Sequence, residues 1–324
     1  MTFALNYAPT VGTRLTVVNN TGAAAIQGAF SNLAQGQLVR MIYGGTAYSF
    51  VANYYGGTDN DLVLEWANTR LLAWGGNGSG RLGINSTTNS NVPVAVIMSG
   101  VLSGKTILAN IPGGAHSLAM CSGTLAAWGQ GGNGQLGNNN TTDSSVPVAV
   151  NRTGALAGKT VVAMGGGSVD SLALCSDGKI AAWGSYSSGQ LGYDSVSPPY
   201  LTNSVPFPVD QSGVLAGKRV IAVAAGASHS LALCSDGMLA AWGDNYVAQL
   251  GNNAHLTTND LSRVPILVND FGALVGRQVK AITAGSNHNL ALCADGALVA
   301  WGSNSNGQYG NNTTTSSKVP GSGQ

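Results

Sequence analysis

The sequence predicts an all-β fold: a β-propeller-like array of about five four-stranded repeats, preceded by a small antiparallel β module. Three observations lead to this prediction. Charged residues make up only 8% of the chain, which contains 47 glycines, a composition typical of short strands joined by tight turns. A tryptophan-centred segment recurs five times along the chain. Each recurrence offers about four short strands, which is the content of a propeller blade.

The N-terminal module is expected over residues 1–66, with the repeats over 67–324. The segments "RLTVVNNTG", "AAIQGAF", "QLVRMIYGGTAYSFVANYYGG" and "NDLVLEW" alternate apolar and polar residues and predict five or six antiparallel strands. The run "DLVLEWANTRLLAWG" imitates the later "SLALCSDGKIAAWG". We therefore expect the last strand of the module to serve as an inner strand of the first blade.

The repeats are aligned by their tryptophans, which are spaced 54, 55, 59 and 59 residues apart. Examples are "LAAWGQGGNGQLG" and "IAAWGSYSSGQLG", each followed by a polar loop and a Val-Pro pair. The regular spacing indicates one structural unit copied along the chain. The five tryptophans are Trp74, Trp128, Trp183, Trp242 and Trp301.

Each of the four later tryptophans follows a strand–turn–strand pattern such as "VDSLALCSDGKIAAWG". Asp177-Gly178, Asp236-Gly237 and Asp295-Gly296 predict two-residue hairpin turns, because glycine tolerates positive φ. Apolar runs such as "VIAVAAGA" precede these hairpins and suit buried strands.

The stretch "GALAGKT" at 154–160 superficially resembles a phosphate-binding loop. That loop needs four residues between its first glycine and Gly-Lys, whereas three stand here. Related stretches, "GVLSGKT", "GVLAGKR" and "GALVGRQ", occupy the same place in other repeats. A nucleotide site is needed once and a turn is needed in every repeat, so the stretch is interpreted as a turn.

The pattern of "SHSLALCSDGMLAAWG" followed by "GQLG" resembles the repeat of the regulator of chromosome condensation family, over residues 62 to 320. The resemblance implies a β-propeller, most often of seven blades. His116, His229 and His288 match the histidine of that repeat, and Asp170 replaces it in one copy. Five units leave three closures open: a five-unit ring, an arc completed by the N-terminal segment, or closure by a neighbouring chain. The N-terminal segment, mainly through "GGTDNDLVLEW", resembles a β-rich module of large bacterial surface or secreted proteins.

The repeated cysteines and histidines, and the Asp-containing stretch at 56–64, are explained better by structural roles than by chemistry. No catalytic residue, metal site or cofactor is therefore expected. Cys121, Cys175, Cys234 and Cys293 share one repeat position and predict small buried thiols. The repeated histidines are expected to bond the backbone of their own blade rather than form a metal ring. "GGTDNDLVL" at 56–64 is one residue from a calcium nonapeptide, but such sites need stacked copies, so a hairpin turn is favoured.

Composition also excludes some partners. The formal net charge of +1 gives no electrostatic reason to bind nucleic acid. No apolar run approaches the roughly 18 residues of a membrane helix, so membrane insertion is not expected. The start "MTFALNYAPTVG" lacks the features of a signal peptide and is interpreted as a fragment boundary or a mature start.

A partner-binding face is expected on the two longest loops between tryptophan and Val-Pro, which span 23 residues instead of 19. Exposed aromatic residues supply contact area at a small entropic cost. The alternative is that these aromatics pack over their own loops, and it is slightly favoured. The candidate partner-binding residues are Tyr186, Tyr193, Tyr200, Phe207, Tyr246 and His255.

The expected function is that of a non-enzymatic binding or structural module of a bacterial extracellular or cell-surface protein. Its expected partner is a protein or a second copy of the chain, because an incomplete repeat at each end leaves strand edges open. The family resemblance implies an alternative as a protein-partner regulator, either a guanine-nucleotide exchange factor or a secreted enzyme inhibitor.

Overall fold

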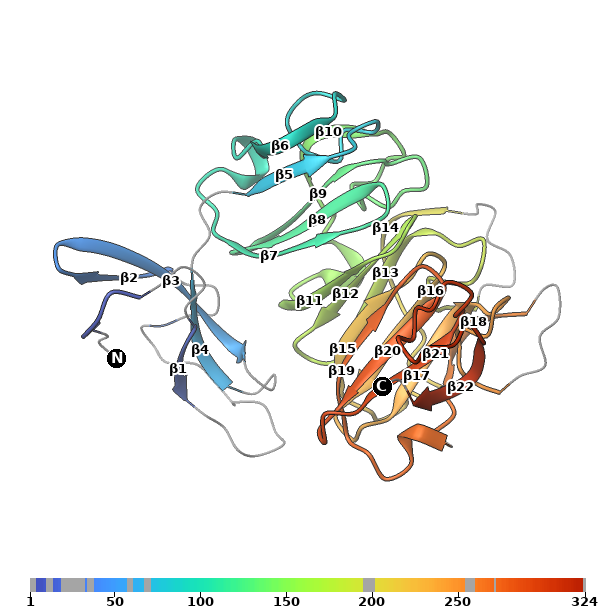
Figure 1. The fold of residues 1–324 in the computed structure, drawn as a ribbon. Helices are drawn as coiled ribbons and strands as arrows, with labels where there is room; N and C mark the ends of the chain where they lie inside the picture. The colour runs from blue at the N-terminus through green and yellow to red at the C-terminus, as the bar shows by residue number, and fades with distance from the viewer. Residues whose placement is uncertain are drawn as a thin grey trace.

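The computed structural model describes residues 4–9, 14–18, 33, 38–56, 61–66, 71–194, 202–253, 260–270 and 272–322. Over these residues the chain is built of β-strands and three one-turn 3₁₀ helices (Figure 1). The all-β prediction is therefore confirmed. None of the helices in the described ranges is long and apolar enough to cross a membrane.

The N-terminal segment forms an antiparallel sheet of its own. Its strands are β1 (Arg14–Val18), β2 (Leu38–Tyr43), β3 (Thr46–Gly56) and β4 (Asp61–Trp66), in the order β1-β4-β3-β2. Phe50, Leu62 and Leu64 are buried in the core of this sheet. Four strands are described here instead of the five or six expected, and the segment "AAIQGAF" lies outside the described residues.

The expectation that this segment lends its last strand to the first blade is wrong. Strand β4 pairs with β1 on one side and β3 on the other, whereas β5 (Leu72–Gly75) pairs with β6 (Ser90–Ala95). Both edges of β4 are occupied, and its apolar side chains face the core of the N-terminal sheet. Among the described residues, the first repeat is therefore a two-stranded half-blade.

Each of the next four repeats is a four-stranded antiparallel sheet, with its strands side by side in chain order. This confirms the predicted content of one blade per repeat. The strands of the first and second full blades are β7 (Ile107–Pro112), β8 (His116–Cys121), β9 (Thr124–Gly129), β10 (Ser144–Ala149), β11 (Val161–Gly166), β12 (Asp170–Cys175), β13 (Ile180–Ser185) and β14 (Thr202–Pro208). Those of the third and fourth are β15 (Val220–Ala225), β16 (His229–Cys234), β17 (Leu239–Asp244), β18 (Leu261–Leu267), β19 (Val279–Ala284), β20 (His288–Cys293), β21 (Leu298–Gly302) and β22 (Ser317–Ser322).

The Asp-Gly hairpins differ from the predicted two-residue turn. In the hairpin loop of the second blade, residues 176–178, only Gly178 has a positive φ, of 78°, and its N–H donates to the carbonyl of Cys175 at 2.9 Å. The N–H of Cys175 in turn donates to the carbonyl of Lys179 at 2.8 Å. This is the three-residue loop in which a glycine in the left-handed region follows a type I turn. Asp177 stabilises the loop by accepting from the Lys179 N–H at 3.1 Å.

The "GALAGKT"-type stretches form the expected turns. Three of them contain the 3₁₀ helices η1 (Gly100–Leu102), η2 (Gly154–Leu156) and η3 (Gly272–Leu274), and the leucine of each is buried. These turns connect the outer strand of one blade to the inner strand of the next. The interpretation as a repeated connection is confirmed.

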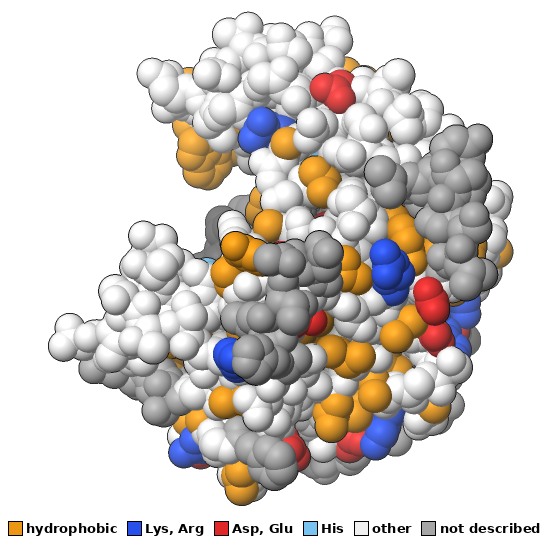
Figure 2. Space-filling model, turned by 90° about the vertical axis from the view of Figure 1, so that its right-hand side faces the viewer, with side chains coloured by type: hydrophobic (Ala, Val, Ile, Leu, Met, Phe, Trp, Pro, Cys, Tyr) orange, Lys and Arg blue, Asp and Glu red, His pale blue; other side chains and the backbone are white. Residues whose placement is uncertain are grey.

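The hydrophobic core runs between consecutive blades rather than inside each sheet. Leu172 and Leu174 of the second blade pack with Ala232 and Trp242 of the third, and every residue of β12 and β13 is buried. The blades form an open arc, which the space-filling view shows as a C-shaped outline with a notch (Figure 2). Charged side chains are sparse and scattered on that face (Figure 2).

Candidate functional site

A hydrogen-bonded junction recurs between consecutive blades. Trp183 donates its indole Nε1–H to the backbone carbonyl of Gln135 in the preceding blade at 2.9 Å, and the Ser171 hydroxyl donates to the same carbonyl at 2.9 Å. Two bonds from one blade thus converge on one carbonyl of its neighbour. The corresponding pairs of tryptophan and carbonyl are Trp128 with Arg81, Trp242 with Gln190, and Trp301 with Gln249.

A glycine provides the space for each indole at this junction. A Cβ built on Gly83, Gly137, Gly192 or Gly251 would lie 2.6 to 2.8 Å from the tryptophan of the next blade. Each of these glycines also has a positive φ. The last glycine of the "GQLG" motif is therefore required by the junction between blades.

The repeated histidines extend this junction, which corrects the expectation that they bond the backbone of their own blade. His116 Nε2 lies 2.9 Å from Ser171 Oγ, and His229 Nε2 lies 2.7 Å from Asn289 Oδ1, so both partners belong to the next blade. Burial lowers the pKa of both histidines to about 4. They are therefore neutral at pH 7 and act as links between blades. In the described part of the chain, no three His, Cys, Asp or Glu side chains are grouped as metal ligands.

Asp170 holds the histidine position of the second blade. Its side chain is fully buried, and neither carboxylate oxygen has a hydrogen-bond partner among the described residues. Burial raises the pKa of Asp170 well above its ordinary value. Because an ionised carboxylate in such surroundings is costly, the side chain favours its protonated form.

The cysteines are buried free thiols, as predicted. Burial raises the pKa of Cys121 to about 12 and those of Cys175 and Cys234 to about 11. Nucleophilic attack requires a thiolate, so these side chains have a packing role.

The half-blade exposes the tryptophan that, in the full blades, is buried against the loop of the preceding blade. Trp74 is 62% exposed, whereas the four other tryptophans of the repeats are between 0 and 2% exposed. A cavity of about 430 Å³ opens beside it, and Leu71, Ile111 and Trp128 contribute to its lining. In the described part of the chain, β5 pairs on one edge only.

The fourth blade exposes the kind of loop that receives such a tryptophan at the other junctions. Its "GQYG" loop contains Gln308 and Gly310, which correspond to Gln135 and Gly137 of the first blade. A Cβ built on Gly310 would meet no described atom within 4 Å, although Gly310 has the same positive φ as its counterparts. One end of the arc thus offers an indole, and the other end offers an empty place for one.

Three of the predicted binding aromatics pack together on the long loop of the second blade. The ring centroids of Tyr186 and Tyr193 are 4.9 Å apart, and Tyr193 lies 4.6 Å from Phe207. Tyr186 is 4% exposed and Phe207 is 44% exposed. Tyr246 is 62% exposed in the loop of the third blade, while Tyr200 and His255 lie outside the described residues. The available contact area at these positions therefore belongs mainly to Phe207 and Tyr246.

The role of Tyr186 was missed in the sequence. Asn77, Asn245 and Asn304 hold the equivalent position in other repeats, and each organises its loop by hydrogen bonds to backbone atoms within it. Tyr186 replaces this asparagine, and its hydroxyl donates to the Tyr193 carbonyl at 2.7 Å. The signal was the position three residues after each tryptophan, which is asparagine in three of the five repeats.

Comparison with protein families agrees with the internal repeat. A model described as the regulator of chromosome condensation (RCC1) repeat matches residues 122–174, 177–233 and 236–292. A second model of that repeat matches residues 220–249 and 279–308. Together the matched segments extend from the first full blade into the fourth.

Curated relatives share this part of their sequences. The E3 ubiquitin-protein ligase HERC2 of Mus musculus is 31% identical over 304 residues, covering 91% of this chain and 6% of its own length. The ultraviolet-B receptor UVR8 of Arabidopsis thaliana is 33% identical over 201 residues, covering 61% of this chain and 41% of its own. The chain thus spans less than half the length of either relative.

Solved structures show the same fold. Yeast RCC1 (Prp20), solved with Kap60 bound, has a TM-score of 0.63 and 25% identity, covering 79% of this chain and 58% of its own. Human WBSCR16 has a TM-score of 0.64 and 24% identity, covering 86% of this chain and 65% of its own. A structure of Prp20p from Saccharomyces cerevisiae, with a TM-score of 0.61 and 25% identity over 79% of this chain and 60% of its own, is described with its binding to Gsp1p and histones.

Proposed function

Because the chain belongs to the regulator of chromosome condensation (RCC1) repeat family, we propose that it is a non-catalytic β-propeller module that binds protein. Yeast RCC1, which shares its fold, was solved with the protein Kap60 bound. The titratable groups buried in this chain are spread over successive blade junctions instead of converging on one cavity. Such an arrangement supports a binding scaffold rather than an active site.

The partner that we propose is a second copy of the chain, associating head to tail. The observation that carries this proposal is the exposed Trp74, whose counterparts are all buried against the "GQLG"-type loop of a neighbouring blade. The unfilled loop at Gln308–Gly310 is the matching acceptor. Because the two faces differ, one copy can use its indole on the next copy while its own acceptor stays available, which is a heterologous contact.

The proposed location is the surface or exterior of a bacterium. Support comes from the low charge, from loops rich in Asn, Thr and Gly, and from the resemblance of the N-terminal segment to modules of bacterial surface proteins. Association through blade ends would suit a surface protein that builds up an extended assembly.

The test is the molar mass of the 324-residue chain in solution, measured by sedimentation velocity over a wide range of concentrations. We expect reversible association, weakened at least tenfold by Trp74→Ala because the indole fills the acceptor loop. Tyr43→Ala is the matched control, since Tyr43 is an exposed aromatic residue of the N-terminal sheet, away from both blade ends. A chain that stays monomeric at every concentration, or association that is indifferent to Trp74→Ala, would overturn the proposal.

A further inference from the structure

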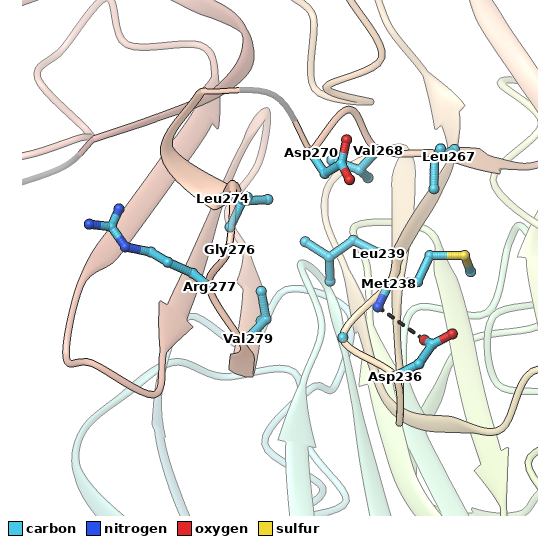
Figure 3. A pocket seen from close by; sticks show the side chains of 11 residues that line it. Asp236, Met238, Leu239, Leu267, Val268, Asp270, Leu274, Gly276, Arg277 and Val279 are labelled. Carbon is cyan, nitrogen blue, oxygen red and sulfur yellow. Dashed lines mark hydrogen bonds between the residues drawn. The ribbon is translucent and has the colours of Figure 1, made fainter.

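A cavity of about 270 Å³ lies in the third blade, between the β16–β17 turn and the turn that contains η3 (Figure 3). Leu239, Val268, Leu274 and Val279 give it apolar walls. Asp270 and Asp236 lie at different places on its rim (Figure 3). Its volume lies just below the roughly 300–1,000 Å³ usual for small-molecule pockets, and it is large enough to take one long side chain.

The first two full blades fill the same place with a side chain of their own. In the first blade, Arg152 donates from Nη1 to the carbonyl of Gly123 at 2.9 Å and from Nη2 to the carbonyl of Lys159 at 2.6 Å. In the second blade, Gln211 donates from Nε2 to the carbonyl of Gly178 at 2.9 Å. Both side chains thus donate to the carbonyl of the hairpin glycine, and Arg152 also joins it to the connecting turn.

The third blade has Asp270 at this position, two residues after the buried Val268, just as Arg152 follows Val150. A carboxylate cannot donate to the carbonyl of Gly237, the hairpin glycine of this blade. In the described part of the chain no hydrogen bond reaches the Asp270 side chain. The carbonyls of Gly237 and Arg277, which correspond to those of Gly123 and Lys159, therefore lack the donor that Arg152 provides in the first blade.

The cationic side chains near this cavity are bound elsewhere. Arg277 directs its guanidinium to Asp295, with Nε 2.8 Å from Oδ2, and to the carbonyl of Ala273 at 2.8 Å. Lys218 pairs with Asp236 at 2.5 Å, and Asp236 also accepts from the Met238 N–H, drawn as a dashed line in Figure 3. The site therefore keeps a carboxylate and two carbonyl oxygens as acceptors without an internal donor.

We infer that this cavity binds the guanidinium of an arginine side chain supplied by another polypeptide. The incoming group would take the place that Arg152 fills in the first blade. Its planar fork donates to several acceptors at once, and a carboxylate is its preferred partner. Its aliphatic stem would pack against Leu239 and Leu274, as long basic side chains pack on apolar surface. The inference is independent of the head-to-tail contact, because Trp74 and Gln308–Gly310 line no part of this cavity.

The probe for this site is N-acetyl-L-arginine amide, titrated against the full chain by isothermal calorimetry. We expect saturable binding that Asp270→Asn weakens at least tenfold, because the variant removes the charge that pairs with the guanidinium. Asp194→Asn is the matched control: it makes the same charge change at an exposed aspartate of the second blade, and it should leave binding unchanged. N-acetyl-L-lysine amide should bind at least tenfold more weakly, since it lacks the planar fork.

Asp270→Arg gives an independent test that also controls for folding. By analogy with Arg152, the new arginine should fill the cavity from within, so we expect the variant to lose arginine-amide binding and to melt at a higher temperature. Absence of saturable binding to the unaltered chain would overturn the inference. It would also be overturned by equal binding of the lysine amide, or by undiminished binding to Asp270→Asn or Asp270→Arg.

Discussion

Asp170 shows how one residue can set the pH dependence of a repeat protein. The other three full blades have histidine at this position, and Asp170 is buried with no hydrogen bond to its carboxyl oxygens among the described residues. Its pKa in the folded chain is raised above the ordinary value of 3.8. The folded state therefore becomes less stable as the pH rises from 3.8 through the raised pKa, because ionisation is easier in the unfolded chain.

Asp170→Asn should remove this loss of stability. We expect the variant to have a larger free energy of unfolding than the unaltered chain at pH 7, and the difference should shrink as the pH is lowered towards 3.8. The measurement is urea unfolding over a series of pH values, with Asp194→Asn as an exposed control. A difference that is constant with pH would contradict the prediction.

His116 and His229 give the stability of the chain the opposite dependence on pH, and the Asp170→Asn variant should keep that dependence. Their pKa values are lowered from 6.5 to about 4, so the stability they contribute is present above pH 6.5 and is lost as the pH falls towards 4. Both chains should therefore lose this histidine contribution over the same pH range, from 6.5 to about 4, while the gap between their stabilities narrows. A loss of stability in that range for the variant alone, where Asp170 no longer titrates, checks the histidine contribution separately.

Burial was predicted from the sequence for side chains that recur at one position of the repeat. The four cysteines and four of the tryptophans are buried as expected, because a residue copied at the same position in each repeat has the same neighbours. The partners of the histidines were not predicted. Ser171 lies 55 residues after His116, and only the packing of blades shows that the two meet.

The connection that precedes each histidine strand shows why glycine recurs there. A Cβ built on Gly226 would overlap the imidazole of His229, and the same holds for Gly113 with His116 and Gly285 with His288. Neither Gly113, Gly226 nor Gly285 has a positive φ. The glycine is thus required by the space that the ring needs and, at Gly113 and Gly226, by a backbone carbonyl of the next blade, rather than by its own backbone conformation.

Gly226→Ala should consequently destabilise the chain by roughly 1–3 kcal/mol, the usual cost of overpacking a core. Gly213→Ala is the matched control, because a Cβ at Gly213 would meet no described atom within 4 Å. Urea unfolding at pH 7 measures both changes. If the clash with the ring is the cause, adding His229→Ala should reduce the effect of Gly226→Ala; full additivity of the two substitutions would refute this explanation.

At the level of elements, the periodic strands were predictable and the pairing of one strand was not. The hairpins follow from apolar runs divided by Ser-Asp-Gly, although the loop has three residues because only its glycine is in the left-handed region. The likeness of "DLVLEW" to a blade strand was misleading. Leu62 and Leu64 are equally suited to a core with Phe50, and the choice between the two cores depends on contacts that a local pattern does not contain.

The whole molecule is an arc in which each blade packs on its neighbours, so stability should vary along the chain. In arrays of this kind, stability is approximately the sum of the repeats and their nearest-neighbour contacts. The half-blade has a single neighbouring blade and two strands, and most of β5 is exposed or half-exposed. The second and third blades have neighbours on both sides and buried central strands.

Hydrogen exchange should report this difference. We expect the backbone amides of β5 to exchange much faster than those of β13 and β17, which carry the same Ala-Trp-Gly motif. Mass spectrometry of peptides from the dilute chain measures all three strands in one experiment. Equal protection of β5 and β13 in a dilute sample would contradict an open half-blade.

The repeated junction sets how an array of this design can be lengthened or shortened. Each of the four junctions between blades joins one indole to one "GQLG"-type loop, so a full repeat presents an acceptor loop to one neighbour and a tryptophan to the other. Adding or deleting one whole unit leaves every remaining connection of the same type. Gene duplication and protein engineering can therefore change the number of units freely, provided that the cut points fall at equivalent positions.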